Sequence, residues 1–97
     1  MIQILVKIQV KHFIALEKFE RSAAQIMLTY QGRFLAAFET ARNIDDSGEE
    51  IHILEFPSEK HFEKYRNDER HHSLMELRAE AISATEIKIS TQLKSYQ

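Results

Sequence analysis

The sequence has no cysteine and no tryptophan, and only two glycines and one proline among its 97 residues. The absence of cysteine excludes disulfides, thiolate nucleophiles and cysteine-based zinc sites. Two glycines cannot build a phosphate-binding loop or a dinucleotide fingerprint. So few glycines and prolines also leave little linker material. We therefore expect a single domain, 1–97, that uses no cofactor.

An excess of one charge and a long apolar run are also missing. Thirteen Lys and Arg residues are interspersed with fifteen Asp and Glu, for a formal net charge of −2. This balance argues against a nucleic-acid partner, which normally selects a basic surface. No apolar stretch approaches the roughly 20 residues that span a bilayer. Met1 leads into a strand-like run without the features of a signal peptide, so we expect a cytoplasmic protein with no membrane partner.

Hydrophobic periodicity predicts the secondary structure. Residues 2–10 and 33–44 alternate with a period of two, typical of strands, whereas residues 12–30 repeat every three or four residues, typical of an amphipathic helix. On that helix, Glu17, Lys18, Glu20 and Arg21 are expected to face outward, and Gly32 to follow its C-terminus.

The second half of the chain repeats this pattern. A turn at 45–48 precedes a strand at 49–56, and Pro57 and Ser58 then end the strand and cap a helix that runs to about Arg66. A further helical segment is expected from Asn67 or Asp68 to Ile82, followed by a strand at 85–91 and a tail at 92–97.

The resulting order, β-α-β-β-α-β, predicts an α+β protein with a ferredoxin-like fold. Right-handed crossovers make the first and third strands central neighbours. We expect a four-stranded antiparallel sheet in which these two strands form one parallel central pair.

Two helices can cover only one face of such a sheet. The opposite face is expected to carry Leu5, Leu54 and Phe56, with Phe34 and Phe38 or else Leu35 and Ala37. A patch of several hundred Å² of apolar surface is unusual for a monomer. We therefore predict a homodimer in which the sheets of two chains associate through the faces opposite the helices.

Three segments resemble a known family. The run Leu54–Ser58, then Tyr65, then the run Leu74–Arg78 are similar to a family of small bacterial proteins called domain of unknown function thirteen-thirty. The resemblance extends from the first strand through Arg78. It implies a dimeric α/β barrel of the superfamily that includes antibiotic-biosynthesis-type monooxygenases and muconolactone-isomerase-like proteins. The family has no settled reaction, so the resemblance implies fold and assembly.

Glu55 is the most suggestive candidate for chemistry. It shares a strand face with Ile51 and Ile53, so we expect its carboxylate at the interface between sheet and helices. There it could act as a general base or bind a ligand donor. Alternatively, it caps the following helix or pairs with Arg33 or Arg78.

The other candidates are Arg33, Arg78, Tyr65 and His71. Arg78 lies on an apolar helical stripe, where it needs either a structural partner such as Glu55 or a bound anion. Arg33 could complete an anion clamp, Tyr65 occupies an aromatic position of the family, and His71 could transfer protons. His71 and its neighbour His72 diverge by about 100° on a helix, so we expect no metal site.

His52 projects to the face opposite Ile51 and Ile53, so it is expected near the dimer interface, where it could make association pH-dependent.

The sequence leaves two functions open. The first is a small-molecule-binding or regulatory module. The second is a cofactor-independent monooxygenase- or isomerase-like enzyme that acts on a small aromatic or anionic metabolite. In the enzyme, Glu55 or His71 would handle protons while Arg33 and Arg78 fix charge. A cavity of at least about 300 Å³ lined by Glu55, His71 and Arg78 would favour a ligand site.

Overall fold

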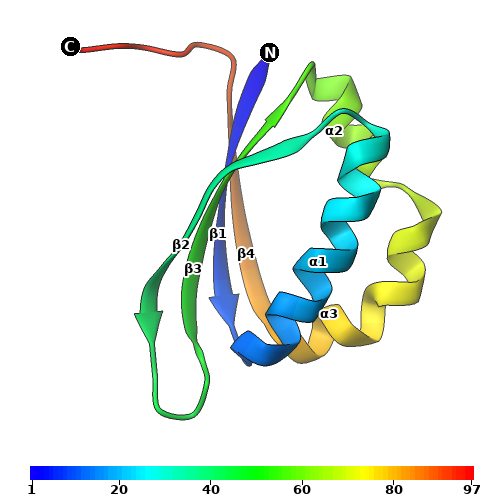
Figure 1. Cartoon of the computed structure of the whole chain (residues 1–97), viewed down its shortest axis with the longest axis vertical. Coiled ribbons are helices and arrows are strands. Elements are labelled where there is room, and N and C mark those ends of the chain that lie inside the picture. The colour runs from blue at the N-terminus through cyan, green and yellow to red at the C-terminus, as the bar shows by residue number, and fades with distance from the viewer.

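The computed structural model describes the whole chain, residues 1–97, as a four-stranded sheet with all helices on one face (Figure 1). The elements are β1 Ile2–Val10, α1 Phe13–Thr29, β2 Arg33–Arg42, β3 Gly48–Phe56, α2 Glu59–Arg66, the 3-10 helix η1 Glu69–Leu74, α3 Met75–Ala81 and β4 Ile82–Ser90. The predicted α+β class and the ferredoxin-like order are confirmed.

The sheet order is β2-β3-β1-β4, which confirms that β1 and β3 are the central neighbours. All three strand pairs are antiparallel, so the predicted parallel central pair is wrong. Helix α1 returns the chain to its starting edge, so β2 runs in the direction of β1. The hairpin then reverses the chain, and β3 must run against β1.

The faces of β3 are also opposite to the prediction. Ile4 pairs with Leu54, so Leu54 and Phe56 point toward the helices. Ile51, Ile53 and Glu55 consequently point away from them. Alternation alone could not decide this, because both faces of the strand carry large aliphatic residues.

Two register shifts interrupt β2, and the first places its two phenylalanines on opposite faces of the sheet. The register shifts between Phe34 and Ala36, so Phe34 lies opposite Leu54 on the helix side, whereas Phe38 lies opposite Ile51 on the open side. A regular strand would have placed both rings on one face.

A 3-10 turn interrupts the predicted second long helix. The Asp68 side chain accepts a hydrogen bond from the Arg70 amide and starts η1. The helix continues as α3 only from Met75, and β4 begins at Ile82, three residues earlier than predicted. These segments, which contain His71 and Arg78, form a wall beside α1 (Figure 1).

The core consists of two clusters on the helix side of the sheet. One gathers around Ile8, Phe13, Phe19 and Ile82, and the other around Ile4, Met27, Leu54, Phe56 and Phe62. Val6 packs against both. The helix face is therefore packed at its two ends, and the space between them is where a cavity forms.

The opposite surface of the sheet is open. Leu5, Ile51 and Ile53 are only partly covered there, and Phe38 is half-exposed. We call the surface formed by these four residues the open face. In Figure 1 the tail after β4 extends away from the helices, on the side of this face. No helix of the chain has the length and apolar character needed to cross a membrane.

Candidate functional site

A cavity of about 300 Å³ lies between the helix face of the sheet and the helices. Eleven of its eighteen lining residues are hydrophobic. Its walls combine Ile8, Phe19 and Ile82 from one core cluster with Leu54 and Phe62 from the other. We call it the inner cavity; its seven other lining residues are Glu20, His52, Arg66, His71, His72, Arg78 and Thr85, and Tyr65, counted among the hydrophobic ones, adds a hydroxyl group. The clusters thus enclose a site of ligand size with a few polar groups on its wall.

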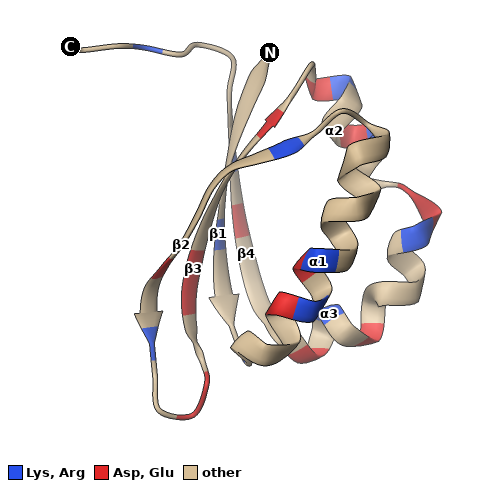
Figure 2. Cartoon of the chain, in the orientation of Figure 1, with Lys and Arg blue, Asp and Glu red and all other residues tan.

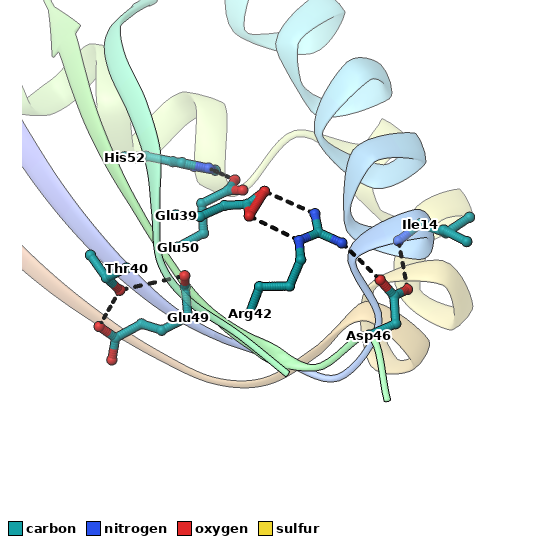
Figure 3. A network of polar contacts seen from close by, with 8 residues as sticks. All are labelled: Ile14, Glu39, Thr40, Arg42, Asp46, Glu49, Glu50 and His52. Atoms are coloured by element: carbon teal, nitrogen blue, oxygen red, sulfur yellow. Dashed lines mark hydrogen bonds and ion pairs between the residues drawn. The ribbon is translucent and has the colours of Figure 1, made fainter. Parts of the chain in front are cut away.

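His52 lies on the floor of this cavity. It pairs across the sheet with Val6 and is 3% exposed, so it is on the helix side and not at the predicted dimer interface. Its Nε2 lies 2.5 Å from Oε2 of Glu50, which fixes the ring orientation (Figure 3). Its Nδ1 lies 4.0 Å from Oε2 of Glu20. An imidazole is therefore held between two carboxylates.

Glu20 reaches this group from α1. The sequence places it among outward residues, but its side chain is only 20% exposed because it bends toward His52. Burial raises the pKa of Glu20 to about 7; the nearby charges of His52 and Arg78 oppose the increase, and Glu50 adds to it. A carboxyl with this pKa can donate or accept a proton near neutral pH.

Tyr65 and His71 form another part of the wall. Their rings meet edge to face with centroids 4.9 Å apart. Burial raises the pKa of the Tyr65 hydroxyl, helped by the negative charge of Glu20. Burial lowers the pKa of His71 and favours its neutral form. Nε2 of His71 is buried and has no hydrogen-bond partner.

Arg78 supplies the cationic part of the lining. It is exposed, belongs to α3, and has no carboxylate within ion-pair distance. Its charge is nevertheless close enough to lower the pKa of Glu20. Of the residues selected from sequence, Tyr65, His71 and Arg78 are therefore brought together around one cavity.

Glu55 and Arg33 lie on the other side of the sheet. Oε1 of Glu55 accepts hydrogen bonds from Nε and Nη2 of Arg33, at 3.0 and 2.7 Å, and Oε2 accepts one from Gln3 at 3.1 Å. The hydrogen bonds from Arg33 are the main reason that the pKa of Glu55 is lowered. The expected position of Glu55 between sheet and helices is wrong. Of its alternatives, the structure contains the pair with Arg33.

A second depression, of about 570 Å³, opens between α1 and β2. We call it the outer groove; it includes Phe13, Arg21, Glu39, Arg42 and Glu50. It shares Glu20, Phe34 and His52 with the inner cavity. These three residues separate a solvent-open groove from the more apolar interior.

An ion-pair network holds the groove and the hairpin against α1. Arg42 donates from Nε and Nη2 to the two oxygens of Glu39, and from Nη1 to Asp46 at 3.1 Å (Figure 3). The other oxygen of Asp46 accepts from the Ile14 amide at 3.2 Å. Arg42 also lies 4.0 Å over the Phe13 ring. The β2–β3 hairpin, whose second strand carries Glu50 and His52, is thus tied to the start of the helix that carries Glu20.

Sequence reasoning missed Glu20 and the position of His52. Glu20 follows Phe19 and is three residues before the apolar position Ala23, so it borders the apolar stripe of α1. His52 alternates with Leu54 and Phe56, which are both buried. These two sequence positions are the signals from which the inward direction of Glu20 and His52 could have been predicted. No three His, Asp or Glu side chains are arranged to hold a metal ion.

Solved structures resemble the whole fold at low sequence identity. A protein of unknown function from Rhodopseudomonas palustris is 15% identical, with a TM-score of 0.76 over 97% of this chain and 83% of its own. A NIPSNAP family protein of unknown function from Agrobacterium tumefaciens is 22% identical, with a TM-score of 0.69 over 93% and 86%. SnoaB, a cofactor-independent oxygenase from Streptomyces nogalater, is 9% identical, with a TM-score of 0.70 over 98% and 95%.

These likenesses support the fold alone. No curated protein matches the chain. A family match covers residues 3–91, from β1 through the end of β4, and agrees with the resemblance carried by Tyr65 and the runs around Glu55 and Arg78. The chain belongs to the family described as a domain of unknown function, DUF1330.

Proposed function

We propose that this chain is a one-domain homodimer that binds a small metabolite in the inner cavity of each subunit. The observation that carries the proposal is the cavity of about 300 Å³, whose largely apolar wall includes Glu20, His52 and Arg78. Small-molecule sites typically combine such a wall with a few convergent polar groups and perturbed pKa values. Glu55 and Arg33 take a structural role in this proposal, because their contacts are on the opposite face.

The open face supports the homodimer. Leu5, Ile51, Ile53 and Phe38 form an apolar strip that their own subunit covers only in part and no helix covers. The tail beyond β4 extends from the same side and carries Leu93 and Tyr96, which are 77% and 89% exposed. Charged residues of both signs are dispersed over the chain and do not form a one-sign surface that would keep two copies apart (Figure 2). A second copy would bury the strip and give the tails a surface to pack against.

Thermal-shift screening of monocyclic metabolites tests the ligand site. Wild-type protein is compared with Glu20→Gln, which changes the cavity wall, and with Glu55→Gln, which makes the same chemical change on the opposite face. We expect compounds that stabilise wild type and Glu55→Gln, with the shift reduced in Glu20→Gln. A broad library without a single stabilising compound would contradict the proposal, as would shifts that depend on Glu55 instead.

A cofactor-independent enzyme is the second candidate, and the Glu20–His52–Glu50 arrangement favours it. Glu20 has a pKa suited to removing a substrate proton at neutral pH, and Glu50 keeps the imidazole of His52 oriented beside it. An oxygenase or an isomerase that removes a proton from an acidic C–H bond would need such a base. SnoaB shows that this fold can carry a cofactor-independent oxygenase, although its activity is a property of SnoaB.

Proton exchange separates the two candidates. A ligand found by screening is incubated in D₂O with wild type, Glu20→Gln or Glu55→Gln, and its deuterium content is followed by mass spectrometry. An enzyme of this kind incorporates deuterium at carbon with wild type and Glu55→Gln but not with Glu20→Gln. Binding without exchange in any variant identifies a binding module.

A further inference from the structure

His71 lines the inner cavity and has a buried ring nitrogen, Nε2, without a hydrogen-bond partner. Burial lowers the pKa of His71 and keeps the ring neutral, and the Tyr65 backbone partly opposes that shift. Nε2 has no partner, and the influence of the Tyr65 backbone favours a proton on the other ring nitrogen, Nδ1. In the neutral ring, Nε2 is then a lone-pair acceptor.

Folded proteins leave few buried polar atoms unsatisfied. Tyr65 meets the His71 ring at 81° and does not supply a proton to Nε2 in this structure. Nε2 of His71, a residue of the cavity wall, is therefore an unsatisfied acceptor in the neutral ring. A ligand with an O–H or N–H group would satisfy this acceptor by donating a hydrogen bond to Nε2.

Arg78 indicates a second feature of the ligand. Its guanidinium lines the same cavity without an ion-paired carboxylate, whereas Arg66, which also lines it, is paired with Glu63. Arg78 is exposed, so it marks the solvent side of the cavity, where a charged group is bound at lower desolvation cost than among the core residues. A planar guanidinium matches a carboxylate by paired hydrogen bonds.

The cavity volume limits the size of the ligand skeleton that carries the hydrogen-bond donor and the carboxylate. About 300 Å³ corresponds to roughly ten water volumes. That space accommodates one ring with small substituents, and the hydrophobic majority of the wall suits a ring.

We infer that the inner cavity binds a single-ring hydroxy acid, whose hydroxyl donates to Nε2 of His71 and whose carboxylate pairs with Arg78. The inference rests on the proposed small-molecule site and names its ligand class.

Isothermal titration calorimetry with matched probes tests it. The probes are the 2-, 3- and 4-hydroxybenzoates, the methylbenzoates in which a methyl group replaces each hydroxyl, benzoate and phenol. We expect one hydroxybenzoate to bind wild type about tenfold more tightly than its methyl counterpart, the effect of one hydrogen bond to a buried acceptor.

Three variants assign the groups. His71→Phe keeps a flat ring and removes the acceptor, so it should bind benzoate as wild type does while the preference for the hydroxyl disappears. His12→Phe changes an exposed histidine outside the inner cavity and should retain the preference. Arg78→Gln should weaken all the benzoates about tenfold and leave phenol unaffected.

The outcomes separate this inference from the function on which it rests. Equal binding of hydroxyl and methyl probes overturns the role of His71, especially if a crystal structure shows an ordered water on Nε2. That result does not contradict the proposed small-molecule site. A hydroxyl preference that survives in His71→Phe overturns it as well. If no benzoate or phenol binds wild type while another class of metabolite binds in the cavity, the ligand class is wrong and the proposed function stands. If no compound of any class binds, both fail.

Discussion

The chemical properties of the inner cavity depend mainly on one residue, Glu20, and its carboxyl group. Four groups from three other elements face it: His52 and Glu50 from β3, Arg78 from α3 and Tyr65 from α2. Burial has the largest effect on its pKa. The protein therefore keeps a protonated acid beside an imidazole up to about neutral pH, at a cost in stability when that acid ionises.

Glu20→Gln should reveal this cost as a pH dependence. The folded pKa of Glu20, about 7, is above the unfolded value of 4.5, so the folded state binds more protons between these values. Wild-type stability should thus fall by about 3 kcal/mol relative to the variant as pH rises from 4.5 to 7.5. Urea unfolding of both proteins across this range measures the difference. The matched Glu55→Gln comparison should show no such loss on raising the pH, and a pH-independent difference for Glu20→Gln would contradict the buried-acid description.

At this scale, the sequence predicted Tyr65, His71 and Arg78 as candidates, and they line one cavity. It could not place Glu20 or Glu55 correctly. Glu20 is at the margin of an apolar helical stripe, where a small rotation decides between solvent and interior. Glu55 is on a strand with apolar residues on both faces, so alternation left the direction of its side chain undetermined.

At the scale of elements, the end of α1 shows how backbone and core are fitted together. Gln31 has a φ of 59° and takes the left-handed position, and the amide of Gly32 donates to the Met27 carbonyl at 3.1 Å. The sequence predicted a glycine at this helix end for its backbone freedom. Gly32 is instead required for space, because a Cβ there would lie 2.6 Å from Cγ of Met27 and would overlap the buried Phe56 ring.

Gly32→Ala should therefore destabilise the protein by about 1–3 kcal/mol, the usual range for overpacking a core. Chemical denaturation monitored by circular dichroism measures the change. Gln31→Gly is the neighbouring control and should be neutral or stabilising by up to about 1 kcal/mol, because glycine adopts the left-handed conformation without strain. A tolerated alanine at Gly32 would show that the Phe56 ring can move.

The predicted strands and α1 agree with the structure because each has a clear hydrophobic period. The register shifts of β2 and the 3-10 helix η1 have no such signal, since both depend on how neighbouring elements pack. These two features decide where the functional groups lie. The shift between Phe34 and Ala36 puts Phe34 beside His52, with centroids 5.2 Å apart, and η1 puts His71 beside Tyr65.

At the scale of the whole molecule, the proposed ligand binding and the proposed assembly use opposite sides of the sheet. The inner cavity is formed on the helix side, whereas the apolar residues of the opposite face are only partly covered by the chain itself. Assembly and ligand binding can therefore be tested independently.

Phe38→Glu should convert a dimer into a monomer. Phe38 is 49% exposed on the open face, and a buried, unpaired carboxylate at a sheet–sheet interface would be strongly unfavourable. Sedimentation velocity at micromolar concentration should give a dimer for wild type and a monomer for the variant. Leu28→Glu, at a residue 64% exposed on α1, should remain dimeric. A monomeric wild type would contradict the proposed assembly.

The location of bound ligand tests the central claim most directly. Protein with labelled Ile, Leu and Val methyl groups is mixed with 4-hydroxybenzoate, or with a metabolite found in the thermal screen, and intermolecular NOEs are recorded. We expect NOEs from the ligand ring to Val6, Ile8 and Leu54, which line the inner cavity. NOEs confined to Leu5, Ile51 and Ile53 on the open face would contradict it.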